Sequence, residues 1–254
     1  QTVGGLNVPG IYRIQNSRER PKTTGFASRK QIESFFAGAT LGWKNAVYLD
    51  LTGRQDWSST LPDGLNGYFY PSLSASYVFS EMLDLPKMSF GKLRLGWASV
   101  GGDTDPYNIY TTYSYVNNFG SSPQYTVPDR LNNPSLKPER TNSLEAGLDL
   151  RFFRDRLGLD LTVYTGKTVD QIIPLSTSAA SGYPQQVINA GEIQNKGIEI
   201  ELSARPVVRG RFAWDVAFNF GRNRNKVVAI LPDDPSIKSL PLADAIFGGA
   251  SVHA

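Results

Sequence analysis

The stretch NNPSLKPERTNSLEAGLDLRFFRDRLGLDLTVYTGKT (residues 132–168) decides the fold. From Asn142 onward every second side chain is apolar, and the side chains between them are small or charged. The apolar positions are Leu144, Ala146, Leu148, Leu150 and Phe152, and they alternate with Glu145, Gly147, Asp149 and Arg151. A period of two residues is typical of a β-strand whose two faces meet different surroundings.

A short turn at residues 154–156 separates this strand from a second one with the same period. The second strand alternates Leu157, Leu159, Leu161 and Val163 with Gly158, Asp160, Thr162 and Tyr164. Two alternating strands joined by a short turn predict an antiparallel hairpin.

The same period recurs along most of the chain and predicts an all-β, antiparallel fold. Strands are expected at about residues 31–43, 47–54, 68–79, 89–100, 142–152, 157–164, 192–204 and 211–221. Beyond Gly221 the alternation of apolar and polar side chains becomes indistinct.

The lengths of the connections indicate whether the sheet lies in a membrane or in water. Short turns are expected at 44–45, 80–88, 154–156 and 205–210, and longer links rich in Gly, Pro, Ser, Asp and Asn at 55–67, 101–141 and 168–191. Strict alternation of short and long links is typical of a transmembrane β-barrel of the bacterial outer membrane, because its two rims differ. A soluble β-sandwich has mixed loop lengths at both ends.

Aromatic side chains give a second indication, since membrane barrels carry aromatic girdles at both interfaces. One predicted girdle, near the short turns, comprises Trp43, Tyr77, Phe79, Phe152, Phe212 and Trp214. The other comprises Trp57, Tyr68, Phe69, Tyr70 and Trp97. In such a barrel the leucine face meets hydrocarbon, and the polar face lines a hydrated interior.

Composition excludes several other classes. The 26 basic and 23 acidic residues are spread along the 254-residue chain without a basic block, so no nucleic-acid footprint is expected. The chain has no cysteine and a single histidine, His253, which rules out disulfides and multi-histidine metal sites. The sequence contains no run of about 18 apolar residues, so no membrane-spanning helix is predicted.

Two loop segments hold candidate binding residues. In GGDTDPYN (101–108), Asp103 and Asp105 offer oxygen ligands suited to Ca²⁺, or form a polar turn. In YTTYSYVNNFGSSPQY (110–125), aromatic and amide side chains suit contact with a sugar, a peptide or a partner protein. These candidates are Tyr110, Tyr113, Tyr115, Asn117 and Asn118. Packing against neighbouring loops is an equal alternative for this second segment.

No catalytic site, cofactor site or metal site is assigned. TGKT at 165–168 lacks the upstream glycine of a phosphate-binding loop, and it follows a strand without opening a helix. The carboxylates of the polar strand face could pair as glycosidase acid and nucleophile, but they stand among Lys92, Arg94 and Arg151, which favours a mixed-charge lumen.

Several longer strings carry a family resemblance. NPSLKPERTNSLEAGLDLRFFRDRLGLDLTVYTGKTVDQII, VINAGEIQNKGIEIELSARPV and FAWDVAFNFGRNRNKVV resemble the C-terminal barrel of SusC/RagA-type TonB-dependent transporters of Bacteroidetes. VYLDLTGRQDWSSTLPDGLNGYFYPSLSASYVFSE and KLRLGWASVGGDTDPYNIY resemble upstream strands of the same barrel. The resemblance covers nearly the whole chain.

This resemblance implies a 22-stranded barrel in the bacterial outer membrane, with an N-terminal plug. It also implies import of oligosaccharides or peptides with a SusD-like surface lipoprotein, driven by TonB–ExbB–ExbD, and it is compatible with a dimer of such pairs. The eight or nine strands of this chain would then form part of the wall of that barrel and contact outer-membrane lipid.

Residues 1–254 are accordingly expected to be an internal segment of one barrel domain. The family's plug, TonB box and closing strand have no counterpart here, and the sequence ends in IFGGASVHA. Unpaired strand edges are costly in lipid, so the tails 1–30 and 222–254 favour flanking strands over closure of eight strands. Two alternatives stay open: a soluble carbohydrate-binding β-sandwich and a small outer-membrane barrel enzyme.

Overall fold

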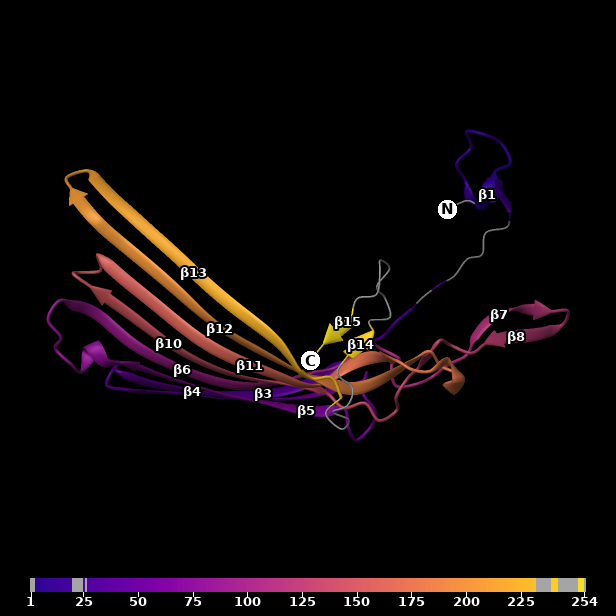
Figure 1. Cartoon of the computed structure of the whole chain (residues 1–254), viewed down its shortest axis with the longest axis horizontal. Coiled ribbons are helices and arrows are strands. Elements are labelled where there is room, and N and C mark those ends of the chain that lie inside the picture. Colours follow the sequence, from indigo (N-terminus) through magenta and orange to yellow (C-terminus); the bar gives the residue numbers. More distant parts are fainter. Residues whose placement is uncertain (1–2, 20–24, 26, 232–238, 242–250, 254) are drawn as a thin grey trace.

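The computed structural model describes residues 3–19, 25, 27–231, 239–241 and 251–253. Its main feature is one curved antiparallel sheet in which eight strands follow one another in chain order, each hydrogen-bonded to the next (Figure 1). These strands are β3 (Ile32–Trp43), β4 (Val47–Ser58), β5 (Gly67–Val78), β6 (Met88–Gly102), β10 (Glu139–Phe152), β11 (Leu157–Ser176), β12 (Gln185–Arg209) and β13 (Phe212–Ala229). The predicted all-β, antiparallel fold is confirmed.

Short elements surround this sheet. β9 (Arg130–Leu131) pairs in parallel with β12, and three small hairpins lie outside the sheet. The hairpins are β1–β2 (Val3–Leu6, Ser17–Glu19), β7–β8 (Ser114–Phe119, Ser122–Thr126) and β14–β15 (Ser239–Pro241, Ser251–His253); single 3₁₀ turns are η1 (Ile14–Asn16), η2 (Phe79–Glu81) and η3 (Ala179–Ser181). In the described residues, no helical segment has the length and apolar character needed to cross a bilayer.

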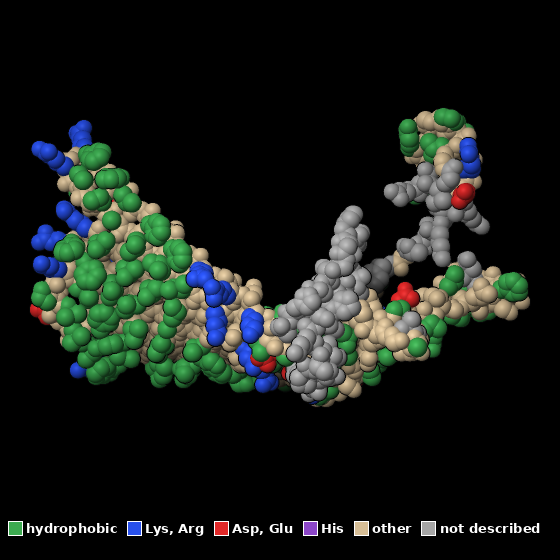
Figure 2. All heavy atoms as spheres, in the orientation of Figure 1, with side chains coloured by type: hydrophobic (Ala, Val, Ile, Leu, Met, Phe, Trp, Pro, Cys, Tyr) green, Lys and Arg blue, Asp and Glu red, His purple; other side chains and the backbone are tan. Residues whose placement is uncertain are grey.

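The register places apolar side chains in continuous rows across the sheet. One row crosses all eight strands through Trp43, Val47, Tyr77, Leu93, Leu148, Leu161, Ile200 and Phe220. In the part of the chain that the structure describes, no second protein layer covers this face: Leu93 is 40% exposed and Val216 is 41% exposed. Figure 2 shows hydrophobic side chains covering the strands on the visible face. The β-sandwich alternative is therefore wrong.

The outward apolar side chains form a band that runs diagonally across the register. On β3 this band is centred at Ala39, whose row ends at Arg224 on β13, whereas the band on β13 is centred at Val216. The centre of the band is thus displaced by eight residues on β13, from Arg224 to Val216, which is about 26 Å along the strand. The distance across the sheet from β3 to β13 is seven strand-to-strand steps, or about 34 Å. The strands must tilt by about 40° to keep the band level, which is the tilt of transmembrane barrels.

The tight turns lie together at one rim of the sheet. Between β3 and β4, Lys44 and Asn45 have φ values of 52° and 53°, as in the two-residue turn whose twist matches that of the flanking strands. Between β10 and β11, Phe153, Arg154 and Asp155 also have positive φ. These turns allow consecutive strands to pair without a break at this rim.

The strict alternation of short and long links is wrong in detail. β11 continues to Ser176 and β12 begins at Gln185, so the link expected at 168–191 is reduced to residues 177–184. The turn at 79–87, at the opposite rim, is longer than that. The reason is that these two strands continue their hydrogen-bond ladder beyond the apolar band, where polar side chains hide the two-residue period.

The predicted end of the last strand and one predicted girdle also need correction. β13 continues to Ala229 because its pairing with β12 persists. The sequence did not reveal this extension because the outward side chains change from Phe220 to Arg222. Tyr68 and Tyr70 pair with Asp56 and Arg54 on the inner face and therefore do not belong to the outer aromatic girdle. Most of the tail from 232 to 254, including much of IFGGASVHA, lies outside the described residues.

The prediction that Leu148 faces lipid and Asp149 faces the barrel interior can be tested directly. Leu148 lies near the mid-line of the apolar band, so Leu148→Arg should lower the stability of the assembled barrel by roughly 2–4 kcal/mol. Asp149→Asn, the adjacent position on the inner face, should have little effect. Denaturant titration of the complete protein in lipid vesicles would measure both, and equal losses for the two variants would contradict the assignment of faces.

Candidate functional site: the inner face and the long loops

The inner face of the sheet carries rows of charged side chains. Lys92, Asp149, Asp160 and Glu201 are consecutive in one row across β6, β10, β11 and β12. From the next row, Arg94 donates through Nη2 to Asp160 Oδ1 at 2.8 Å. About a third of each of these two side chains is exposed, so their ion pair is hydrated and contributes little to stability. The register thus places the carboxylates among cations, as the lumen interpretation predicts.

Glycines opposite the larger inner side chains let those side chains lie flat on the sheet. Gly147 faces Arg94 across β10 and β6, and Gly197 faces Tyr164 across β12 and β11. A Cβ atom at either glycine would collide with the side chain opposite. Arg94 also lines an open groove of about 450 Å³, together with Asp50, Lys92 and Glu145 among others. This surface offers hydrogen bonds and charges to polar solutes.

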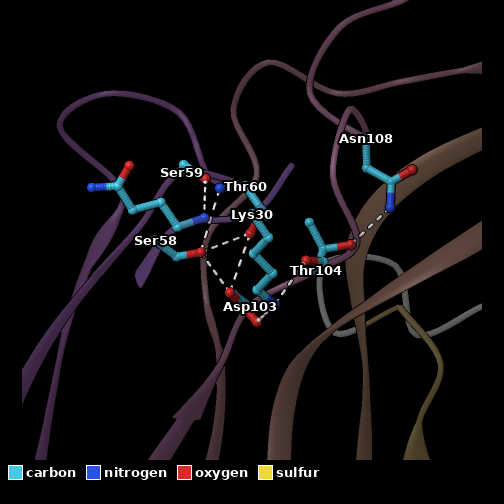
Figure 3. Close-up of polar contacts among 8 residues, drawn as sticks. Lys30, Ser58, Ser59, Thr60, Asp103, Thr104 and Asn108 are labelled. Atoms are coloured by element: carbon cyan, nitrogen blue, oxygen red, sulfur yellow. Dashed lines mark hydrogen bonds and ion pairs between the residues drawn. The ribbon is translucent and has the colours of Figure 1, made fainter. Parts of the chain in front are cut away.

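At the opposite rim from the tight turns, Asp103 joins three segments of the chain (Figure 3). Its carboxylate accepts from Lys30 Nζ at 2.7 Å, from Ser58 Oγ at 2.5 Å and from Thr60 Oγ1 at 3.3 Å. Lys30 precedes β3, Ser58 ends β4, and Asp103 follows β6. One mostly buried carboxylate therefore ties the ends of three strands together.

The two predicted calcium ligands behave differently. Asp103 is occupied by the three donors just described, whereas Asp105 is exposed and makes no part of that network. Among the described residues there is no cluster of three or more histidine, aspartate or glutamate side chains arranged to hold a metal ion. Asp103 thus braces the segment 101–108 in this structure, and the calcium site stays a prediction.

A small apolar core lies beneath the same loops. It consists of Leu61, Tyr68, Ile109, Leu136 and Val187, with Tyr70 and Ile172 packed against it. Leu136 is fully buried and Val187 is 2% exposed. These side chains come from two connections, from the start of β5 and from the extensions of β11 and β12, so the long loops pack on one another and on the sheet.

Two asparagines hold the loop 103–138: Asn189 fastens it to the sheet, and Asn132 ties two of its parts together. Asn189 of β12 accepts from the Lys137 backbone N–H at 2.8 Å and donates to the Lys137 carbonyl at 2.7 Å. Asn132 donates to the carbonyls of Tyr107 and Tyr110 at 3.0 and 2.7 Å. The Asn- and Pro-rich start of the stretch at 132–138 therefore serves to dock this loop.

The tyrosine candidates lie on a separate feature, near and on the β7–β8 hairpin, which projects away from the sheet (Figure 1). Tyr110, Tyr113 and Tyr115 are 64%, 62% and 55% exposed. Tyr115 donates through its hydroxyl to Asn118 Oδ1 at 3.0 Å and packs edge-on against Tyr125. The side chain of Asn117 lies outside the described part of the structure. The candidates thus divide into Asp103 in the buried brace, the exposed Asp105, and exposed residues on or just before the hairpin.

Sequence reasoning did not find the loop core or its brace. Lys30, Ser58 and Thr60 are ordinary polar residues at strand ends, and only their convergence on Asp103 distinguishes them. Leu136 was a detectable signal, because it is the single large apolar side chain in the polar segment 132–138.

These features together define a class of protein. An antiparallel sheet with a tilted apolar band outside, charges inside and packed loops at one rim is part of the wall of an outer-membrane β-barrel. Residues 3–245 match the family described as "TonB dependent receptor-like, beta-barrel". The chain belongs to this family of outer-membrane proteins.

Individual relatives agree with this assignment. The TonB-dependent receptor P26 of Formosa agariphila is 32% identical over 226 residues, covering 86% of this chain and 23% of that protein. The TonB-dependent receptor SusC of Bacteroides thetaiotaomicron is 29% identical over 241 residues, covering 89% and 24%. The chain therefore spans about a quarter of the length of these curated relatives.

Solved structures show the same fold. The RagAB peptide importer in its "closed-closed" state superposes with a TM-score of 0.76 at 20% identity, covering 84% of this chain and 24% of the matched chain. The siderophore receptor PirA of Pseudomonas aeruginosa superposes with a TM-score of 0.52 at 18% identity, covering 79% and 36%. The SusC/RagA-type resemblance of the sequence is confirmed.

The brace at Asp103 predicts a local effect on the loops. Asp103→Ala removes the acceptor of the buried Ser58 hydroxyl and the anionic partner of Lys30, so the loop rim should lose about 1–3 kcal/mol of local stability. Backbone hydrogen exchange should then rise in residues 58–61 and 103–138 while the strands stay protected. Asp105→Ala is the matched control, and equal exchange in the two variants would contradict the brace.

Proposed function

We propose that the complete protein is a TonB-dependent outer-membrane importer of oligosaccharides or peptides, for which this chain supplies barrel wall, lumen surface and extracellular loops. The observation that carries the proposal is the combination of a continuous apolar outer face with a charged, hydrated inner face on the same strands. Such a wall separates lipid from an aqueous interior through which a polar solute can pass.

Residues 1–254 are proposed to be one segment of a single, larger barrel domain of about 22 strands. In the described residues β3 and β13 each pair with only one of the long strands, and an unpaired strand edge in hydrocarbon costs several kcal/mol for each free backbone group. Additional strands on both edges would remove this cost. The plug domain and the TonB box are proposed to belong to parts of the protein beyond this segment.

The exposed hairpin supports a role in contact with ligand or partner. Rings at Tyr113 and Tyr115 present flat apolar faces beside hydroxyl groups, a combination that suits sugars and peptides. One structural relative is a peptide importer by its description. A SusD-like lipoprotein at the loop rim, TonB–ExbB–ExbD on the periplasmic side, and a dimer of transporter–lipoprotein pairs complete the proposal. Transport without covalent chemistry is proposed, since Asp56, Asp149 and Asp160 of the inner face are each paired with an arginine.

Uptake by the complete protein tests this function. Cells that contain the full-length transporter should accumulate labelled oligosaccharides or labelled peptides, and accumulation should stop when TonB is absent. Uptake of one class alone would identify the substrate. Accumulation that is independent of TonB, or growth and uptake unaffected by deletion of the transporter gene on every sugar and peptide source tried, would contradict the proposal.

The tyrosines of the hairpin segment give a finer test. The double variant Tyr113→Ala, Tyr115→Ala should raise the substrate concentration for half-maximal uptake by roughly five- to 150-fold, because each of the two lost ring contacts contributes about 0.5–1.5 kcal/mol. Replacement of both tyrosines by Phe keeps the rings and should retain most of the affinity. Unchanged uptake by the Ala variant would assign the hairpin to loop packing instead.

A further inference from the structure

A group of basic side chains lies on the outer face of β10–β13, directly beyond the apolar band. It comprises Arg140, Lys167, Lys196, Arg222, Arg224 and Lys226. The register links them to the lipid face: Arg222 is opposite Ile198, and Lys196 lies between Thr165 and Arg224 in the row that also contains Leu144. In Figure 2 basic side chains gather on the visible face where the apolar side chains end. We call these six residues the outer basic patch.

The outer basic patch lies at a defined height in the membrane. Arg222 is six residues and Lys226 ten residues above Val216, the centre of the band on β13. At roughly 3.3 Å per residue and a tilt of about 40°, these positions lie about 15 and 25 Å above the mid-line. Half of an apolar band of about 25 Å is about 12 Å, so the patch begins just above the hydrocarbon. The other four cations fall between those two heights.

The charge of the outer basic patch is largely unbalanced. In the described residues its one ion pair joins Lys167 Nζ to Glu192 Oε1 at 2.9 Å. The residues Lys196, Arg222, Arg224 and Lys226 are all exposed. On the inner face the same part of β13 carries Asn223 and Asn225. Cations therefore alternate with neutral amides over residues 222–226, and in this part of β13 only the outward positions are charged.

The patch is also confined to one side of the sheet. At comparable heights on β3–β5 the outward positions are Glu33, Gln55, Trp57 and Phe69, which include no cation. A general preference of barrel rims for basic residues would have placed some there as well. The confinement to β10–β13 is the mark of a particular contact surface.

We propose that the outer basic patch binds the phosphate groups of a phosphorylated glycolipid in the outer leaflet of the membrane. Arginine and lysine on adjacent strands, such as Arg224 beside Lys196, can together enclose one phosphate with charge-assisted hydrogen bonds. Immediately below, Ile198, Ile200 and Phe220 form a surface for the acyl chains of the same molecule. The charge complementarity and the height select a lipid headgroup as the occupant. This inference depends on the outward orientation of the face and is independent of what the barrel imports.

The test uses the full-length protein extracted from its own outer membrane in mild detergent. The variant Lys196→Gln, Arg222→Gln, Arg224→Gln should retain at least fivefold less glycolipid phosphate per protein, measured by phosphate analysis and native mass spectrometry. The expectation follows from a factor of about five in affinity for each cation near an anionic lipid surface. Retention equal to that of the unaltered protein would overturn the proposal.

Two further variants separate charge from folding and from position. Lys196→Arg, Arg222→Lys, Arg224→Lys keeps the charges and should keep the lipid. Arg156→Gln, Arg209→Gln, Arg211→Gln removes three cations at the rim of tight turns and should also keep it, with all variants checked for barrel assembly by heat-modifiable gel mobility. Loss of lipid in the charge-keeping variant or in the tight-turn variant would contradict the proposed site.

The class of lipid is tested by adding back defined probes to delipidated protein. A diphosphorylated, acylated glucosamine disaccharide should bind at least fivefold more tightly than its dephosphorylated counterpart and than phosphatidylglycerol. Equal binding of the dephosphorylated lipid would rule out phosphate recognition, and equal binding of phosphatidylglycerol would rule out a site built for the glycolipid.

Discussion

The structure depends on one constraint, which is that every backbone N–H and C=O group in hydrocarbon needs a partner within the protein. The ladder from β3 to β13, with bulges between β6 and β10 and between β12 and β13, meets this need at every junction between neighbouring strands. Tight turns with positive φ at Lys44, Asn45 and residues 153–155 allow the ladder to begin again without a gap. Once the backbone is satisfied in this way, the outward side chains need only to be apolar.

This constraint reverses the usual roles of the two faces. The side chains that a soluble protein would bury, such as Leu93 and Val216, stand partly exposed on the outside, where lipid serves as their solvent. Charged residues such as Arg94 and Asp160 face inward and stay hydrated. The compact apolar packing that remains is small and lies among the loops around Leu136, where water is present and loop backbone must be held by side chains such as Asn189.

Alternation in the sequence was sufficient to predict most strands and both faces, because the period of two is a property of neighbouring residues. It failed where the outer face met something other than hydrocarbon. On β13 the outward residues become Arg222 and Arg224, so the apolar signal disappears although the strand continues. Beyond Asp170, β11 is paired in the same way outside the band, and the sequence there reads as a loop.

The sequence by itself therefore determined the strand class, the identity of the lipid face and the family. Tertiary structure alone decided the tilt of about 40°, the assembly of Lys30, Ser58 and Asp103 into one brace, the inward position of Tyr68, and the level alignment of six cations from four strands. The physical reason is that alternation is set between adjacent residues, whereas these features depend on the offset between strands. That offset is fixed by turns and pairing between residues far apart in the chain.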